Sequence, residues 1–425
     1  MREMKPSGVE WIGDIPEDWG VVTIGSLFKV RNEKVNDTDY PPLSVTKGGI
    51  VPQMENVAKT DANDNRKQVL TNDFVINSRS DRKQSCGVSP LDGSVSLINI
   101  VLYPNKGAPV NPALLNYLMK NAAFAEEFYR WGHGIVADLW TTRWQEMKNI
   151  FLPLPSRPEQ EAIVAFLDRK CGQVDALVKN VQAQIEQLKA YKQSLISETV
   201  TKGLNPNAPM KDSGVEWIGK IPQGWEVRKL KYIANSFTKG AGITKEQIAS
   251  NGDTPCVRYG EIYTKYNFTF SACETRTNRG ILGSCQFFSH GDVLFTCTGE
   301  LVEEIGKSIA YLGYEECLAG GDIVIMKHSQ NPKFLGFSLA SLYAQEQKSR
   351  GQAKLKVVHT SASALGNIYV VLPPLAEQEA IADFLDRKCA QIDRLIAVKQ
   401  AKIEQLEAYK KSLIYEVVTG KIACE

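Results

Sequence analysis

A long segment of this chain occurs twice, and this repeat constrains the fold more than any other feature. Residues 159–201 and 377–419 align without a gap at an offset of 218, with 29 identities in 43 positions. A second pair precedes them, since MKPSGVEWIGDIPEDW at 4–19 returns as MKDSGVEWIGKIPQGW at 210–225. The chain therefore consists of two half-molecules, each a variable body followed by a nearly invariant segment.

The repeated segments are predicted to be long helices. Prolines stand at the start of each segment, and Gly203 and Gly420 suit the position after a helix end. At 1.5 Å per residue, each segment would span about 65 Å. Apolar residues at heptad spacing predict that the helices pair as an antiparallel coiled coil with pseudo-two-fold symmetry. The alternative is two separate amphipathic helices, each on its own domain.

The predicted seam has two departures from apolar character, Gln184 and Lys399. Its apolar members follow from the heptad pattern. They are Leu167, Val174, Leu177, Leu188 and Leu195 in the first helix, and Leu385, Ile392, Leu395, Leu406 and Leu413 in the second.

The two bodies are predicted to share one mixed fold. Strand-like runs at 74–77 and 97–103 precede a helical pattern at 114–131 in the first body. The second body repeats this order, with strand-like runs at 292–296 and 322–326 before a helical pattern at 334–347. The predicted class is α+β, with two similar mixed α/β domains separated by the two helices.

The domain boundaries follow from the repeats. The first domain is predicted at 1–155, with a conserved entry segment at 4–20, and the central helix at 156–209. The second domain is predicted at 210–372, with its entry segment at 210–225, and the C-terminal helix at 373–425.

Composition indicates a globular chain with no global electrostatic signature. The 50 Lys and Arg residues nearly balance 48 Asp and Glu residues, so any nucleic-acid contact must come from local patches. No apolar run approaches 18 residues, the start lacks the apolar stretch of a signal peptide, and nine scattered cysteines suggest reduced thiols. These features predict a cytoplasmic location away from membranes.

Motifs for catalysis are absent from the sequence. The stretch 299–308 resembles a phosphate-binding loop, but six residues separate its glycines where four are needed. The four histidines are too dispersed for a metal site, and no G-x-G-x-x-G follows a strand. No catalytic and no metal-binding residue is therefore predicted.

The chain resembles the specificity subunits of type I restriction-modification systems. The resemblance lies in SGVEWIGDIPEDW and its copy SGVEWIGKIPQGW, and in the LP-P-EQEAI-FLD helix starts at 154–168 and 372–386. It implies that the bodies are target recognition domains for the two halves of a bipartite site on double-stranded DNA. It also implies that the helices separate these domains and dock two modification subunits, in a complex that restriction subunits can join.

The same resemblance implies that the chain is not an enzyme and binds no cofactor. S-adenosylmethionine, ATP and Mg would be bound by the partner subunits of a complex that methylates adenine and cleaves DNA. The alternatives are a self-contained methyltransferase-nuclease and a coiled-coil adaptor without a DNA role. A purified-chain methylation assay separates the first from the specificity subunit, and a gel shift with modification subunits separates the second.

Candidate DNA contacts are polar and basic residues on loops that follow strands. In the first body they are Arg79, Arg82 and Lys83 at 77–84, and Arg143 between two tryptophans. In the second body they are Arg276, Arg279, Thr298, Lys307, Lys354 and Lys356. Thr298 is included because 296–299 follows its strand as 77–80 follows the strand of the first body. For each loop the alternative is a solvated surface turn.

Overall fold

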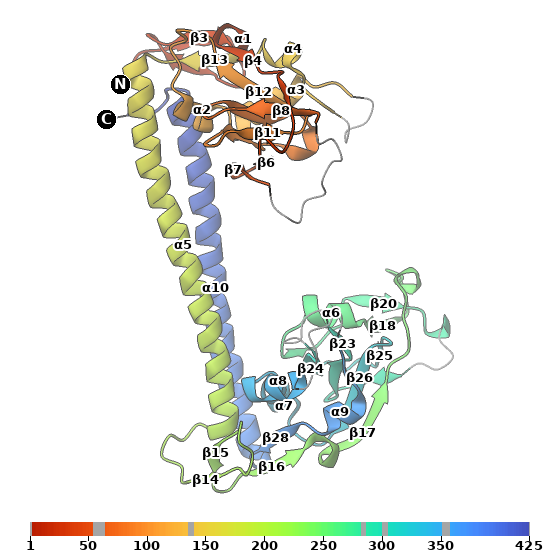
Figure 1. Cartoon of the computed structure of the whole chain (residues 1–425). Coiled ribbons are helices and arrows are strands. Elements are labelled where there is room, and N and C mark those ends of the chain that lie inside the picture. The colour runs from red at the N-terminus through yellow and green to blue at the C-terminus, as the bar shows by residue number, and fades with distance from the viewer. Residues whose placement is uncertain are drawn as a thin grey trace. The chain divides into compact units, whose positions relative to one another are not determined.

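The computed structural model divides into two compact units whose boundaries fall within the long helices. Unit 1 comprises residues 1–182 and 400–425, and unit 2 comprises residues 183–399. The structure describes residues 2–53, 64–134, 140–281, 286–299, 305–350 and 358–424. Helix α5 spans Arg157–Lys202 and helix α10 spans Leu375–Val418, so each unit contains a stretch of both (Figure 1).

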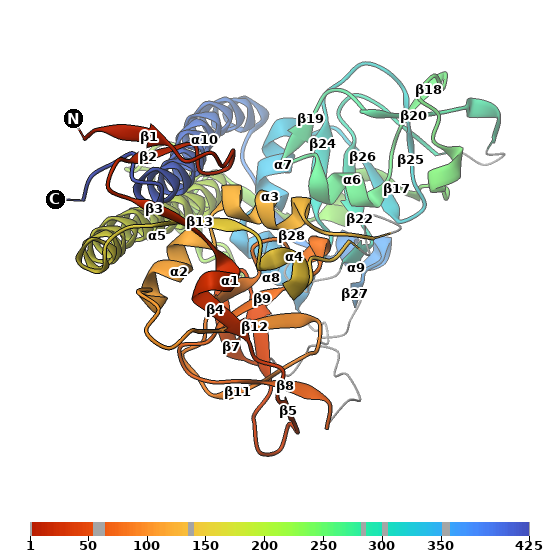
Figure 2. The same cartoon turned by 90° about the horizontal axis from the view of Figure 1, so that it is seen from above.

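Unit 1 is built around a four-stranded antiparallel sheet with the order β10-β9-β12-β4. Its strands are β4 (Phe28–Val30), β9 (Phe74–Asn77), β10 (Cys86–Val88) and β12 (Asn99–Pro104). The main core lies between this sheet, helices α2 (Pro112–Leu118) and α3 (Ala122–Arg130), and the first turns of α5 (Figure 2).

Smaller elements complete unit 1. They are the pairs β1 (Met4–Pro6) with β2 (Asp14–Pro16), β3 (Gly20–Thr23) with β13 (Phe151–Leu154), and β6 (Leu43–Thr46) with β7 (Gly49–Pro52), the sheet of β5 (Lys34–Val35), β8 (Arg66–Val69) and β11 (Gly93–Val95), and the short helices α1 (Ile24–Leu27), η1 (Ser80–Arg82) and α4 (Trp144–Met147).

Unit 2 repeats this plan with a sheet in the order β17-β26-β22-β24-β19. Its strands are β17 (Ala234–Lys239), β19 (Thr269–Phe270), β22 (Val293–Thr296), β24 (Ser308–Tyr311) and β26 (Ile323–His328), next to α7 (Pro332–Leu339) and α8 (Leu342–Ser349). The strand order β24-β22-β26-β17 in this sheet therefore corresponds to the strand order β10-β9-β12-β4 in unit 1.

The other elements of unit 2 form small sheets and short helices. They are β14 (Met210–Asp212) with β15 (Lys220–Pro222), β16 (Glu226–Lys229) with β28 (Tyr369–Leu372), β23 (Thr298–Gly299) with β27 (Val358–His359), the sheet of β18 (Thr254–Val257), β20 (Thr275–Thr277), β21 (Phe287–Phe288) and β25 (Cys317–Ala319), and the helices η3 (Leu230–Tyr232), η4 (Lys245–Gln247), α6 (Tyr259–Thr264), η5 (Arg279–Ile281) and α9 (Ala362–Gly366).

The predicted fold class is confirmed, but each predicted body helix is two helices. The Asn121 side chain accepts a hydrogen bond from the Phe124 backbone N–H and starts α3, which separates it from α2. In unit 2, Ser341 stands at the equivalent break between α7 and α8. Asn favours helix starts because its side-chain oxygen accepts from a free backbone N–H group, whereas the Ser341 hydroxyl donates to the Ser338 carbonyl and forms no capping hydrogen bond with α8.

Helices α5 and α10 pack antiparallel, with symmetry-related ion pairs that fix their register. Lys410 contacts Asp175 at 2.7 Å in unit 1, and Lys192 contacts Asp393 at 2.7 Å in unit 2. The two pairs are equivalent under the offset of 218. Lys399 also donates a hydrogen bond to Gln184, so the two polar departures from the predicted seam lie next to each other.

The prediction that Leu177 and Leu395 line this seam is wrong. They are 53% and 52% exposed. Between Cys171 and Leu188 of α5, the buried and half-buried apolar positions are Cys171, Val174, Val178, Val181, Ile185 and Leu188, which alternate intervals of three and four residues. One residue rotates a helix by about 100°, so a seam that continues from Val174 to Val178 leaves Leu177 on its flank.

The repeated motifs hold each entry segment against the helix starts. The Trp19 indole N–H donates to Glu159 at 2.9 Å, and Trp225 donates to Glu377 at 2.8 Å. At the next position, the Gln160 side chain bonds the backbone of Asn111, Pro109 and Pro155. Gln378 is equally buried and bonds Asn331 and Pro373 in unit 2. The most repeated residues therefore build the junction in each unit.

Candidate nucleic-acid interface

A strand end in each unit presents polar side chains in matching backbone geometry. In unit 1, β9 runs into Ser78 and Arg79, and the Ser78 carbonyl accepts a hydrogen bond from the Thr142 N–H at 3.0 Å. In unit 2, β22 runs into Cys297 and Thr298, and the Cys297 carbonyl accepts from the Thr360 N–H at 2.9 Å. We call these two surfaces the strand-end edges, comprising residues 77–79 with 141–143 and residues 296–298 with 359–361.

The pairing across each edge extends the correspondence to single residues. Arg79 forms an isolated antiparallel bridge with Thr141, and Thr298 pairs with His359 between β23 and β27. Arg143 is the N-cap residue of α4, and Ser361 is the N-cap residue of α9. The equivalence of Thr298 with Arg79, inferred from sequence order, thus has a counterpart in the hydrogen-bond pattern.

In unit 1 the edge places Arg79 and Arg143 near a cavity. Arg143 is exposed, and the Arg79 side chain is 38% exposed, with its Nε 3.2 Å from Asp81. A cavity of about 390 Å³ is lined by Ser78, Thr141 and Arg143 together with Lys67. Lys67 donates to the Asn99 carbonyl at 2.7 Å, and burial lowers its pKa. The cavity therefore combines cationic groups with hydroxyl groups.

Arg82 and Lys83 follow the edge but differ in their surroundings. The Arg82 side chain is 66% exposed, with its Nε 3.6 Å from Asp81. Lys83 contacts Glu126 of α3 at 2.8 Å and lies over the Tyr129 ring at 5.8 Å. A DNA phosphate at Lys83 would have to compete with the Glu126 carboxylate, whereas Arg82 pairs with an adjacent residue of its own loop.

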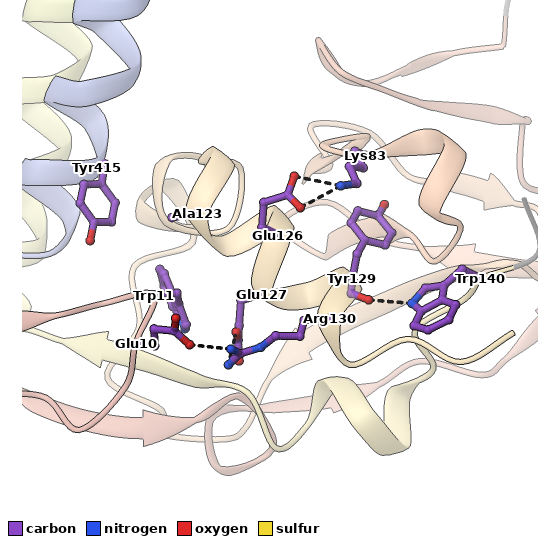
Figure 3. Close-up of a pocket in the computed structure, with 10 residues that line it drawn as sticks. All are labelled: Glu10, Trp11, Lys83, Ala123, Glu126, Glu127, Tyr129, Arg130, Trp140 and Tyr415. Atoms are coloured by element: carbon purple, nitrogen blue, oxygen red, sulfur yellow. Dashed lines mark hydrogen bonds and ion pairs between the residues drawn. The ribbon is translucent and has the colours of Figure 1, made fainter. Parts of the chain in front are cut away.

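Lys83 also lines a pocket of about 840 Å³ in unit 1 (Figure 3). Its walls come from the entry segment, from α3 and from the end of α10, where Trp11, Tyr129 and Tyr415 supply aromatic surface. Arg130 forms ion pairs with Glu10 and Glu127 at 2.7 Å. The charges that line this pocket are largely paired with one another.

In unit 2 the edge is organised by Tyr263 of α6. Its hydroxyl group lies 2.7 Å from Thr296 Oγ1 and donates to the Thr298 carbonyl at 3.0 Å. Thr298 Oγ1 lies 3.3 Å from His359 Nδ1, and His359 is exposed. Lys307 donates to the Tyr263 carbonyl at 3.1 Å. The structure thus brings Thr298 and Lys307 together through Tyr263.

The remaining basic candidates of unit 2 lie elsewhere. Arg276 is on β20, which belongs to a different sheet, and donates to the Gly252 carbonyl at 2.9 Å. Arg279 follows it, contacts Glu316 at 3.3 Å and lies over the Phe287 ring. Lys354 and Lys356 lie outside the described residues. Arg276 and Arg279 therefore form a second basic surface, held by Glu315 and Glu316.

Sequence reasoning missed Thr141, His359 and Tyr263. The first two pair with the strand ends from positions more than 60 residues away, so their proximity depends on the sheet pairing. Arg143 was selected for its charge, yet its neighbour Thr141 is the residue that bridges to Arg79. Comparison of the segments that precede α4 and α9 could have suggested both.

The His, Cys, Asp and Glu side chains of the described residues are dispersed. Within those ranges, no three His, Cys, Asp or Glu side chains gather in a way that could hold a metal ion. Burial raises the pKa of the Cys256 and Cys389 thiols to about 11, which disfavours the reactive thiolate. In the part of the chain that the structure describes, no helix is both long and apolar enough to cross a membrane.

The matches to known proteins are to specificity domains and specificity subunits of type I restriction systems. A family model described as the type I restriction modification DNA specificity domain matches residues 222–408. The type I restriction enzyme MjaVIII specificity subunit of Methanocaldococcus jannaschii is 25% identical over 431 residues, covering 96% of this chain and 94% of that protein.

Two solved structures share the fold over nearly the whole chain. One comes from work on complex assembly and conformational transition of the type I R-M system, with a TM-score of 0.71 and 16% identity, covering 96% of this chain and 99% of that chain. The other is the HsdS subunit from Thermoanaerobacter tengcongensis, with a TM-score of 0.52 and 17% identity, covering 96% and 98%.

Proposed function

We propose that this chain is a specificity subunit of a type I restriction-modification system, and that its two units recognise the two halves of an asymmetric bipartite DNA site. The observation that carries this proposal is the pair of strand-end edges. Their backbone geometry is the same, but Arg79, Thr141 and Arg143 in unit 1 are replaced by Thr298, His359 and Ser361 in unit 2. Similar scaffolds with different side chains suit two different half-sites.

The side chains at these edges suit direct contact with base edges and phosphates. An Arg guanidinium forms two hydrogen bonds with guanine in the major groove, whereas Thr and Ser hydroxyl groups bond several bases. Arg79 and Thr298 are assigned to base contact because they leave the strand ends, and Arg82 to phosphate contact because its side chain is largely exposed. We assign Lys307, Arg276 and Arg279 to phosphate contacts because their cationic groups attract phosphate oxygens.

The helices are assigned to spacing and assembly. Each is continuous over its whole length, and the pairs Asp175–Lys410 and Lys192–Asp393 fix one register. A continuous helix ties the distance between the half-sites to its number of residues. We assign catalysis, S-adenosylmethionine, ATP and Mg to modification and restriction subunits, as the family resemblance implies, and none of these to this chain.

Two modification subunits would dock on exposed apolar patches of the helices. In unit 1, Leu177 of α5 and Tyr409 of α10 are 53% and 53% exposed; in unit 2, Leu395 and Tyr191 are 52% and 58% exposed. All four residues lie directly before a seam residue in the heptad repeat. In an antiparallel pair of helices, this heptad position on one helix faces the same heptad position on the other. Since the patches are equivalent under the 218-residue offset, one type of partner would bind both.

The recognition proposal predicts the effect of removing the unit 1 arginines. Cells that hold the active modification subunits should methylate adenine in one two-part motif only when this gene is present. With Arg79→Ala and Arg82→Ala combined, binding to that motif should weaken about 30-fold or more, because each lost base or phosphate contact costs about 1–3 kcal/mol. Genome-wide mapping of methylated adenine and gel shifts measure both effects.

The matched control is Lys189→Ala, which removes an exposed cation from the face of α5. This control should methylate and bind as the natural chain does. Affinity and methylation that are unchanged in the arginine variant would overturn the assignment of residues 79–82. Methylation by the purified chain alone would favour a self-contained enzyme.

The docking proposal predicts stepwise loss of partners. Leu177→Asp should release one modification subunit and Leu395→Asp the other, because a buried unpaired carboxylate costs several kcal/mol at an interface. Native mass spectrometry of the co-expressed complex should show one fewer modification subunit for each single variant and none for the double variant. Gln173→Asp, at another exposed position of α5, should keep both. Full assembly of the double variant would contradict the proposal.

A further inference from the structure

Unit 2 buries a lysine for which the described residues supply no carboxylate partner. Lys348 of α8 is only 7% exposed, and its Nζ donates to the Leu339 carbonyl at 2.7 Å and to Ser308 Oγ at 3.1 Å. Both acceptors are neutral. A lysine ammonium carries three donors, and two of them are used by these acceptors, while Nζ also lies 5.9 Å from the centre of the Phe295 ring.

The fold does not require a lysine at this position. Lys348 is the seventh residue after Ser341, the N-cap of α8, and Phe128 is the seventh after Asn121, the N-cap of α3. Phe128 is fully buried in the core of unit 1. The equivalent site in unit 1 is thus filled by an aromatic side chain, whereas unit 2 accepts the cost of burying an ammonium.

Lys348 lines a cavity of about 250 Å³ whose walls combine hydrogen-bonding groups with the apolar residues Phe268, Ile305, Leu339 and Ala340. The hydrogen-bonding groups come from Gln193, Tyr263, Asn267, Lys307, Ser308 and Gln345. Among the described lining residues there are two lysines and no carboxylate. A lining that includes two ammonium groups together with amide and hydroxyl groups suits an anion with several oxygens, because charged acceptors form the strongest hydrogen bonds with ammonium donors.

Tyr263 connects this cavity to the strand-end edge of unit 2. It lines the cavity, and its hydroxyl group bonds Thr296 and the Thr298 backbone. We propose that the cavity beside Lys348 binds a phosphate group, either free or on the DNA backbone, and that Lys348 is its principal ligand. The free-phosphate form of this proposal does not depend on the proposed recognition of DNA.

Inorganic phosphate tests the site directly on the full chain. At matched ionic strength, phosphate at ten times its Kd should raise the folded-to-unfolded ratio about tenfold over chloride. Lys348→Met keeps the length of the side chain and removes its charge, so it should fold and lose this response. Lys245→Met, at an exposed position of the same unit, should keep it. No phosphate-specific stabilisation of the natural chain, or an equal response in Lys348→Met, would overturn the proposal.

A DNA arm identifies the source of the phosphate. If it belongs to DNA, Lys348→Met should weaken binding about tenfold for every duplex and lower the salt slope by about one, while sequence preference stays the same. Loss of the phosphate response with unchanged DNA binding would assign the cavity to free phosphate. A changed sequence preference would instead make Lys348 a recognition residue, which contradicts its role as a phosphate ligand.

Discussion

Trp19→Ala is expected to destabilise unit 1 by about 3–5 kcal/mol, the usual cost of deleting a large buried aromatic side chain. Trp19 is 2% exposed and donates its indole N–H to Glu159, so the variant would leave both a cavity and an unpaired carboxylate oxygen. Gly420 packs on the same ring so closely that a Cβ at this position would lie only 3.2 Å from it. The loss would therefore loosen the entry segment, the start of α5 and the end of α10 together.

Hydrogen exchange measures this effect separately in each unit. Amides of α2, α3 and β12 should exchange about 10²- to 10³-fold faster in Trp19→Ala, since each 1.4 kcal/mol is a factor of ten. Trp225→Ala is the matched variant, because Trp225 is equally buried and donates to Glu377. It should affect the core of unit 2 instead. If the amides of unit 1 exchange equally slowly in the natural chain and in Trp19→Ala, Trp19 does not hold the entry segment against the helix start.

The architecture could be predicted from the sequence because the repeat made it visible. The helix ends at Gly203 and Gly420, the strands at 74–77 and 293–296, and the pairing of the long helices follow from local signals. The exposure of Leu177 and Leu395 did not follow, because two heptad assignments that differ by one residue fit the same apolar residues. Only the partner helix decides which of them faces inward.

The candidate site was harder to predict because its members come from distant parts of the chain. A run of basic residues identified Arg79 and Arg82, and strand order identified Thr298. The hydrogen bonds that join Thr298 to Tyr263 and to His359 depend on sheet pairing over 35 and 61 residues. Charge alone also gave no sign that Lys348 would be buried while Arg82 stays exposed.

Lys348→Met is expected to remove a strong pH dependence from the stability of the chain when no phosphate is present. Burial lowers the pKa of Lys348 to about 7, from about 10.4 in an unfolded chain. Holding the proton in the folded state at pH 7 therefore costs roughly 4 kcal/mol, at 1.36 kcal/mol per unit. Methionine avoids this cost but leaves Ser308 and the Leu339 carbonyl without their donor, which costs about 1–3 kcal/mol for each group. The two effects are therefore similar in size, and the stabilities of the two chains at pH 7 should differ by no more than about 2 kcal/mol.

The sign of the pH dependence identifies the titration of Lys348, because a change in packing alone would not depend on pH. Between pH 7 and about 10 the unfolded chain still holds the Lys348 proton and the folded chain does not, so the stability of the natural chain rises with pH. Relative to Lys348→Met, it should gain about 1.4 kcal/mol per pH unit over this range, so the natural chain should be the more stable of the two above about pH 9. Urea unfolding of both chains in phosphate-free buffers measures the difference. A constant difference in stability from pH 7 to 10 would mean that Lys348 is not the titrating group. In that case the buried ammonium would not destabilise the folded chain, and a phosphate ligand would have no such destabilisation to offset.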